Sequence, residues 1–442
     1  MGYDIIFDNL YILSLPPQFN QTRNVEVPGV PGFLAGGGLP PTPAPVTGTP
    51  AELRAITSSW IPDQKVPYAI TWTLGIQRQF FKDWAAEVRY VGTRGVHLLT
   101  QNRINRQPRV TPQNFIPTFL NPPTPAQLAG LPTLAQVIAA RSNFVPAFAA
   151  AGFNAGNLVA FLSNGNSTYH GLQLQLQKRL TQNYSVNLAY TFSKLIDDTT
   201  AELFSTVLAS RRVQDFQNLR AERSLSLLDS PHRLAITANY DLPFFLKSAN
   251  PWLRSLLGGF SVSGTYSYET GKPFTARSGV DSNLNGDNAG DRTILNPNGQ
   301  RGTGSGVRAI NALGQTVPLG NPATVAYVAL NPNAQYIVAG PGALATAGRN
   351  TLRVPAINNF DIFVRKNFRI TEEIRAQFRA DFFNAFNHPQ FVPGSVNGVN
   401  PVTTTATPIS RFTIASDSFF NRPRTTFGSN PRVIQLALRI DF

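Results

Sequence analysis

The sequence contains no cysteine, and its one methionine is the first residue. The absence of cysteine excludes disulfide-stapled scaffolds, thiolate zinc sites and cysteine nucleophiles. Charged residues make up only 14% of the chain, whereas aromatic residues make up 11%, and there are 34 glycines and 35 prolines. This mixture is too aromatic for a disordered chain and too rich in helix breakers for a helical protein. It favours an all-β chain with long loops.

Long apolar runs are also absent. The most apolar region, residues 128–162, is interrupted by Pro132, Arg141 and Pro146. A membrane-spanning helix needs about 20 predominantly apolar residues, so none is expected. The opening segment, Met1 to Asp4, has neither a basic region nor a cleavage site of a secretion signal. We therefore expect the chain to be a fragment of a longer protein.

Alternation of apolar and polar residues is the strongest positive signal. Residues 171–177 read Gly-Leu-Gln-Leu-Gln-Leu-Gln. In a helix Leu172, Leu174 and Leu176 would be scattered around the axis, whereas in a strand they share one face. The next segment, 184–193, repeats this pattern after a short gap. The two segments are predicted to form a β-hairpin.

Similar alternation predicts nine strands along the chain. They are 68–76, 84–90, 171–177, 184–193, 234–240, 260–268, 360–368, 374–386 and 433–442. Most have the length that a tilted strand needs to cross a bilayer, about 9–11 residues. Aromatic residues recur near the strand ends, as the aromatic girdles of membrane barrels require. Polar residues such as Glu87, Arg89, Gln377, Arg379 and Asp381 would face a wet lumen.

The connections between these strands alternate in length. Short or moderate connections are 79–83, 180–183, 241–259 and 369–373, and long ones are 92–168, 194–231, 270–358 and 387–431. Outer-membrane barrels combine short periplasmic turns with long external loops in this way. A soluble β-sandwich also has alternating strands, but it would not explain such long loops on every second connection.

We therefore predict an all-β fold, an antiparallel transmembrane β-barrel of about nine to ten strands with long external loops. The Ala-rich stretch 126–162 is expected to form a helix or two inside one of these loops. Residues 1–60 are predicted to hold a partial strand at 3–7 and a Pro/Gly-rich external loop, and residues 61–442 the barrel region. Phe442 would then end the chain on the periplasmic side.

Two partial matches to enzyme motifs are incomplete. Gly271-Lys272 is followed by Pro273 rather than the Ser or Thr of a phosphate-binding loop, and residues 302–306 do not place Ser at the centre of a nucleophile elbow. The four histidines are far apart in sequence and are expected to be polar residues of strand ends or loops: His97, His170, His232 and His388. No catalytic residue is predicted, and we expect that the protein is not an enzyme.

One segment matches the opening half of a calcium loop, in which oxygen ligands alternate before a glycine. The candidate ligands are Asp281, Asn283, Asn285, Asp287 and Asp291. Position twelve is Arg292 rather than the bidentate Glu, which leaves two interpretations open. The loop either binds Ca²⁺ and braces an external loop, or is an ordinary turn rich in Asn and Asp. No other cofactor is predicted.

The formal charge of +14 suggests an anionic partner, either nucleic acid or the anionic lipid surface of a bacterium. Basic residues are dispersed over strands and loops, and Arg211-Arg212 is the one adjacent pair of arginines. No recognition-helix pattern accompanies them. The sequence therefore predicts that the basic residues face the lumen or contact lipid headgroups, and that nucleic acid is not a partner.

Several short motifs resemble a known family. They are 169–173 (Tyr-His-Gly-Leu-Gln), 190–194 (Tyr-Thr-Phe-Ser-Lys), 229–233 (Asp-Ser-Pro-His-Arg), 271–274 (Gly-Lys-Pro-Phe), 379–389 and the chain end 431–442. Together they resemble the barrel half of Oar-like TonB-dependent outer-membrane receptors, over nearly the whole chain from about position 60. The resemblance implies a carboxypeptidase-regulatory-like domain and a plug before a 22-stranded barrel, so that the N-terminal half would be missing here.

The resemblance implies a role in energised substrate uptake or surface interaction at the bacterial outer membrane. It also implies that Phe442 is read by the barrel-assembly machinery, and that the TonB system is engaged only through the missing N-terminal half. Lipid and lipopolysaccharide of the outer membrane are the other expected partners. Two alternatives stay open, an envelope protein whose loops serve adhesion or structure, and a stand-alone passive channel.

Overall fold

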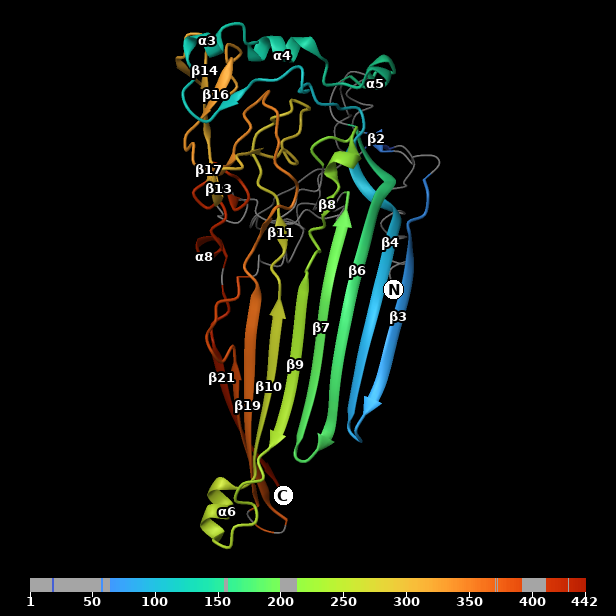
Figure 1. Cartoon of the computed structure of the whole chain (residues 1–442), viewed down its shortest axis with the longest axis vertical. Coiled ribbons are helices and arrows are strands. Elements are labelled where there is room, and N and C mark those ends of the chain that lie inside the picture. The colour runs from blue at the N-terminus through green and yellow to red at the C-terminus, as the bar shows by residue number, and fades with distance from the viewer. Residues whose placement is uncertain are drawn as a thin grey trace, which may run out of the picture.

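The computed structural model describes residues 18–19, 57–58, 64–154, 158–198, 213–369, 371, 373–391, 411–427 and 429–442. Its main feature is a ten-stranded antiparallel sheet with the order β21-β20-β19-β10-β9-β7-β6-β4-β3, in which the short β8 pairs with β7 off this path (Figure 1). All nine predicted strands are present, and each pairs with its neighbour in the chain order. The prediction of an all-β antiparallel barrel wall is confirmed.

The strands of the sheet have these bounds. They are β3 (Tyr68–Phe80), β4 (Trp84–Arg103), β6 (Val159–Thr181), β7 (Tyr184–Asp197), β8 (Ser224–Leu225), β9 (His232–Asp241), β10 (Phe260–Glu269), β19 (Ile357–Arg369), β20 (Arg375–Phe383) and β21 (Val433–Asp441).

Two of these strands, β4 and β6, extend well beyond the predicted ends at 90 and 171. The register between them shifts twice, at His97 of β4, which has a positive φ of 58° and no partner on β6, and at Asn164 of β6, which has no partner on β4. Such a bulge inserts one residue and reverses the alternation of faces beyond it. Before these shifts, residues 91–96 pair regularly with β6, but 92–95 read Gly-Thr-Arg-Gly and carry no large apolar residue, so the alternation stops before the pairing does. By contrast, β20 ends earlier than predicted, because Asn384 turns the chain with a φ of 49°.

Register assigns each strand residue to one of two faces, because residues directly opposite each other share a face. One row across five strands is apolar and consists of Ile76, Val88, Leu174, Tyr190 and Leu234. The adjacent row on the other face is polar and consists of Arg89, Gln173, Thr191, Arg233 and Glu269. We name these the apolar face and the polar face.

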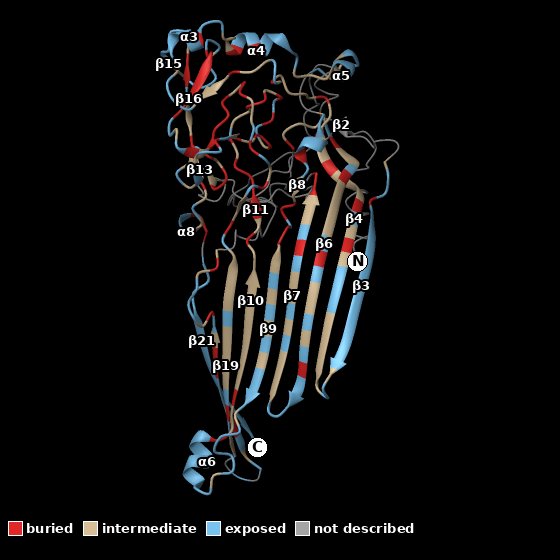
Figure 2. Ribbon diagram, viewed as in Figure 1, coloured by how far each residue is buried: buried red, intermediate tan, exposed pale blue. Residues whose placement is uncertain are grey.

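The apolar face is exposed. Leu74 and Ile76 are each 75% exposed, and Figure 2 shows exposed and half-buried residues along the strands. A β-sandwich would bury this face under a second sheet, so the sandwich alternative does not fit. A wall that meets lipid on its apolar face and water on its polar face does.

The connections sort to the two ends of the sheet, as predicted. The turns 81–83 and 182–183 lie at one end, together with the described residues between β19 and β20, the C-terminus and α6 (Pro251–Leu257) (Figure 1). The four long connections gather at the other end. They contain most of the buried residues among those that the structure describes (Figure 2). We call the described parts of 104–158, 198–231, 270–356 and 384–432 the loop assembly.

The loop assembly contains short elements. Its helices are α3 (Pro125–Leu128), α4 (Leu134–Ala140), α5 (Pro146–Ala150), η1 (Leu219–Glu222) and α8 (Pro423–Thr426). Its strands, besides β8, are β5 (Thr118–Phe119), β11 (Pro273–Phe274), β12 (Ile294–Leu295), β13 (Gln300–Ser305), β14 (Val307–Ile310), β15 (Thr316–Val317), β16 (Ala326–Ala329), β17 (Ala334–Ile337) and β18 (Leu352–Arg353).

The Ala-rich stretch is helical as predicted, but it forms three short helices, α3, α4 and α5, rather than one or two, and its last residues begin β6. Thr133 caps α4, since its side chain accepts a hydrogen bond from the Gln136 backbone N–H and Gln136 reaches back to the Thr133 N–H. Each helix that the described residues form is too short or too polar to span a bilayer. The predicted strand at 3–7 lies outside the described residues. Of the first sixty residues, the structure describes two short paired strands, β1 (Gln18–Phe19) and β2 (Thr57–Ser58).

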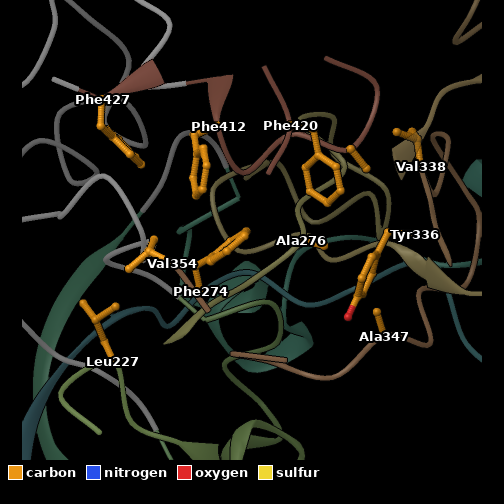
Figure 3. Close-up of a cluster of buried hydrophobic side chains, with 11 residues drawn as sticks. Leu227, Phe274, Ala276, Tyr336, Val338, Ala347, Val354, Phe412, Phe420 and Phe427 are labelled. Carbon is orange, nitrogen blue, oxygen red and sulfur yellow. The ribbon is translucent and has the colours of Figure 1, made fainter. Parts of the chain in front are cut away.

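The hydrophobic core of the chain lies in the loop assembly rather than in the sheet. Its largest cluster is built around Phe274, Tyr336, Phe412, Phe420 and Phe427, which come from two of the long connections (Figure 3). The rings of Phe274 and Phe412 have centroids 4.8 Å apart, and those of Phe412 and Phe427 4.7 Å apart. Aromatic burial of this kind stabilises a fixed structure. The external loops are therefore folded onto one another.

Candidate functional site

Two of the motifs that resemble the Oar-like receptors, 190–194 and 229–233, meet where β7 joins the loop assembly. The Ser193 backbone N–H donates to the Pro231 carbonyl (2.8 Å), and the Ser193 hydroxyl donates to the Ser230 carbonyl (3.0 Å). The Asp229 carboxylate accepts a hydrogen bond from the Leu195 N–H (2.7 Å). The segments 190–194 and 229–233 thus lie against each other through backbone groups that would otherwise be unpaired at the strand end.

A third motif, 271–274, joins the same place through Arg353. The Arg353 guanidinium donates to the Gly271 carbonyl (3.0 Å) and forms an ion pair with the fully buried Asp229 carboxylate. The Val354 N–H donates to the Lys272 carbonyl (3.0 Å). A Cβ on Gly271 would lie 1.8 Å from the Val354 carbonyl oxygen, so a glycine is required at this close approach. We call Ser193, Asp229, Ser230, Gly271 and Arg353 the junction.

Other ion pairs fasten the connection 270–356 to the rest of the molecule. Arg349 pairs with Asp197 at the end of β7, and its Nε donates to the Glu222 carbonyl (2.9 Å). Arg292 pairs with the buried Glu222 carboxylate (2.7 Å). These carboxylates have lost most of their hydration, so each depends on its arginine. The pairs position one long loop against the end of β7 and a second loop.

The predicted calcium loop lies within the same connection and is held by side-chain turns. Asp281 accepts from the N–H groups of Asn285 (3.1 Å) and Gly286 (2.8 Å). Asn283 accepts from the Asn285 N–H (3.0 Å), and Asn285 accepts from the Asp287 N–H (2.8 Å). The bonds of Asn283 and Asn285, each to the N–H two residues on, are successive Asx turns. The ordinary-turn interpretation accounts for them directly.

Neighbouring segments hold this loop in place. The Gln214 carbonyl accepts from both Asn283 Nδ2 (2.7 Å) and Asn285 Nδ2 (3.1 Å). Arg103, at the end of β4, donates to the Gly286 carbonyl (2.6 Å), and its Nε lies 3.3 Å from the Asp287 carboxylate. Four of the five predicted ligands therefore lie together in one turn that contacts β4 and the connection 198–231.

The fifth predicted ligand, Asp291, is fully buried, and its Oδ2 accepts from the Ser282 N–H (2.9 Å). Its Oδ1 has no hydrogen-bond partner among the described residues. Across the part of the chain that the structure describes, no three His, Cys, Asp or Glu side chains are grouped closely enough to hold a metal ion. The calcium site stays a prediction.

Burial raises the pKa of the Asp291 carboxyl well above its ordinary range, and the negative charges of Asp281 and Asp287 raise it further. The folded state thus holds a proton on Asp291 to a higher pH than the unfolded chain does. The free energy of unfolding should therefore fall as pH rises from about 4 toward the raised pKa.

Asp291→Asn is expected to remove this fall, because the amide carries no charge at any pH. The measurement is thermal unfolding of the loop assembly at pH 5 and pH 8 in EDTA, for both proteins. An equal loss of stability in both proteins on going to pH 8 would contradict the assignment. Added Ca²⁺ that stabilises the original protein but not the variant would establish the calcium site, since a ligand of the folded state stabilises it.

His232 begins β9 and His388 lies in a connection, as predicted, whereas His97 and His170 lie within the long strands β4 and β6 rather than at strand ends. His170 and His232 lie on the strands, where Nδ1 of each is hydrogen-bonded to a tyrosine hydroxyl, that of Tyr90 (2.7 Å) and Tyr190 (2.8 Å) respectively. Both pairs belong to the apolar face near its outer end, which is where an aromatic girdle is expected.

Sequence reasoning missed the arginines that hold the loops. Arg349 and Arg353 carry no local motif, and their acidic partners are more than a hundred residues away. The resembling motifs supplied a partial signal, because 190–194, 229–233 and 271–274 all contribute to the junction.

Comparisons with known proteins place the chain among membrane barrels. A family model described as an outer membrane beta barrel domain matches residues 1–435. No curated protein matches the chain.

Solved structures give distant likenesses. The ferric preacinetobactin receptor of Acinetobacter baumannii is 11% identical with a TM-score of 0.37, over 88% of this chain and 31% of that one. The Escherichia coli outer-membrane transporter YddB is 10% identical with a TM-score of 0.33, over 88% and 36%. The ferric citrate transporter FecA is 11% identical with a TM-score of 0.33, over 84% and 31%. The chain thus spans about a third of the length of these structures.

Proposed function

Since the chain belongs to the outer-membrane β-barrel domain family and is located in the bacterial outer membrane, we propose that it is the barrel region of a TonB-dependent uptake receptor. The polar face would line the path of the substrate, and the loop assembly would select the substrate at the cell surface. The residues singled out in the loops are structural, and we propose no catalytic role for any of them.

The loop assembly is the observation that carries this proposal. A receptor needs a surface of fixed shape, because ordering mobile loops on binding reduces affinity. The loop assembly has its own aromatic core and is fastened by buried ion pairs such as Arg353 with Asp229 and Arg292 with Glu222. A passive channel or a purely structural wall requires no such core in its external loops.

The TonB requirement rests on the motif resemblance, three of whose segments contribute to the junction. It is tested by reading the genomic DNA immediately upstream of Met1 in all three frames. We expect an in-frame plug and a secretion signal, because energised uptake acts through a plug in the lumen. A stop codon and a promoter there, with no plug nearby, would contradict TonB-dependent transport by this protein.

Adhesion is the competing function, and a loop deletion separates it from uptake. Removing 107–153 from the intact receptor leaves the β4–β6 hairpin and takes away α3, α4 and α5. The uptake proposal expects loss of substrate uptake by cells whose barrel still runs as a folded, heat-modifiable band. Loss of surface attachment with unchanged uptake would favour adhesion instead.

A stand-alone channel requires a closed barrel. In the described residues β3 and β21 are the two edges of the sheet and pair with no further strand of it. Unpaired strand edges are not tolerated in lipid, so we propose that these edges pair with further strands of the intact receptor. Uniform conductance steps from this chain alone in a planar bilayer would favour the channel.

The chain end is proposed to be the signal for the barrel-assembly machinery. Phe442 follows β21 at the short-turn end and is 99% exposed, so its ring is available to a partner. The apolar face of β21 is expected to contact outer-membrane lipid. Towards the loop assembly, the same face is expected to contact lipopolysaccharide. Phe442→Ala should lower the amount of folded protein in the outer membrane without changing the stability of protein that has inserted.

A further inference from the structure

The connection between β9 and β10, residues 242–259, is unlike the other connections at its end of the sheet. Those at 81–83 and 182–183 are tight turns, whereas this one contains the helix α6. Asn250 caps the helix by accepting from the Trp252 N–H (3.0 Å), and Pro251 occupies its first turn. The Gly258 N–H donates to the Arg254 carbonyl (3.1 Å) and ends it. The segment is therefore folded, not a loose loop.

The side chains of this segment expose an apolar surface. Trp252 is 76% exposed and Leu256 60% exposed. The complete set of exposed large apolar residues here is Phe244, Phe245, Leu246, Trp252, Leu253, Leu256 and Leu257. So many exposed large apolar residues in one short connection indicate an interaction surface rather than a water-exposed turn. We name these seven residues the foot.

The foot continues the lipid-facing surface of the sheet. Tyr240 and Phe260, which flank the connection, both belong to the apolar face by register with Val262 and Lys366. The Lys366 ammonium donates to the Gly258 carbonyl at the end of α6 and lies 4.9 Å from the centroid of the Phe260 ring. Lys366 is only 3% exposed, so its ammonium is covered by the connection and fastens the end of α6 to the apolar face of β19.

The segment 242–259 carries positive charge, which matches an anionic bilayer surface. Residues 242–259 include Lys247 and Arg254 and no Asp or Glu. Basic residues beside exposed Trp, Phe and Leu are the composition of segments that lie in the plane of an anionic bilayer surface. A protein partner would not require this continuity with the lipid-facing wall.

We infer that the foot is embedded in the periplasmic leaflet of the outer membrane, with Lys247 and Arg254 at the phosphate groups of anionic phospholipids. The apolar side chains of α6 extend the hydrophobic band of the barrel beyond the strands. The connection thereby fixes the depth of β9, β10 and β19 in the bilayer.

The absence of cysteine allows a direct test with single cysteines. Leu256→Cys carries an environment-sensitive nitrobenzoxadiazole label in the intact receptor, reconstituted in phosphatidylethanolamine and phosphatidylglycerol vesicles. Val88→Cys, on the apolar face, reports insertion, and Leu313→Cys, an 80% exposed leucine of the loop assembly, is the matched water-exposed control. The proposal expects nitroxide lipids to quench the labels at 256 and 88 several-fold more than the label at 313.

Two results would overturn the inference in vesicles where the label at 88 is quenched. One is quenching of the label at 256 by aqueous iodide, as at 313, with no effect of the lipid nitroxide. The other is protection from both quenchers, which would mean that protein covers the foot.

The headgroup contact has its own test. Lys247→Gln combined with Arg254→Gln is expected to reduce quenching at 256 in the anionic vesicles, and replacing phosphatidylglycerol with phosphatidylcholine should do the same to the original chain. Quenching that is unchanged by both alterations would mean that the foot does not depend on anionic phospholipid.

Discussion

Leu174→Arg is expected to lower the free energy of unfolding of the membrane-inserted protein by about 2–4 kcal/mol. Leu174 lies in the middle of β6 on the apolar face, with Val88 and Tyr190 directly opposite on the neighbouring strands. A guanidinium at this position must enter hydrocarbon or deform the bilayer. Urea unfolding of the protein in lipid vesicles, monitored by tryptophan fluorescence, measures the cost.

The matched control is the neighbouring residue on the other face. Gln175 lies between Glu87 and Ala189 on the polar face, so an arginine introduced there meets water and a carboxylate. Gln175→Arg is expected to change the free energy of unfolding by less than about 1 kcal/mol. Equal costs for the two substitutions would mean that the two faces are not in different solvents.

Arg353→Met is expected to destabilise the loop assembly by about 3–5 kcal/mol. The substitution leaves the fully buried Asp229 carboxylate without its cation, and it removes the hydrogen bond to the Gly271 carbonyl. Methionine keeps most of the length of the side chain, so the loss is electrostatic rather than a cavity. Native-state hydrogen exchange of peptides from 213–231 and 270–356 measures the local free energy of opening.

Arg308→Met is the control for this substitution. Arg308 is an exposed arginine of the same connection, and it has no ion pair within the described ranges. Its replacement is expected to change the opening free energy by no more than about 0.5 kcal/mol. If the two variants gave the same protection, the junction would not be what holds the loops. Faster exchange in the loop peptides alone, with the strands unchanged, is the expected pattern for Arg353→Met.

The strands could be predicted because a barrel wall imposes its two solvents on successive residues. Each central strand, from 68–76 through 360–368, was found at its predicted place. The prediction was wrong at strand ends where a single residue changes the geometry. The segment Gly-Thr-Arg-Gly at 92–95 and the register shifts at His97 and Asn164 hid the long upper parts of β4 and β6, and the turn at Asn384 ended β20 early.

The candidate site was predictable only where its interactions are local. The spacing from Asp281 to Asp287 indicated a turn held by side chains, and those turns are present. The aromatic core and the junction depend on residues far apart in sequence, such as Arg353 and Asp229, and no period or spacing signals such a contact. The motif resemblance marked three of the converging segments without indicating that they meet.

Accessibility along β6 tests the central claim of a lipid-facing and a water-facing wall most directly. Spin labels placed singly at each position from 172 to 177, in the reconstituted protein, would be measured for collision with oxygen, which concentrates in lipid, and with a water-soluble nickel chelate. The account predicts high oxygen collision at 172, 174 and 176 and high nickel collision at 173, 175 and 177. Collision rates without this period of two would contradict a transmembrane barrel wall and every proposal that rests on it.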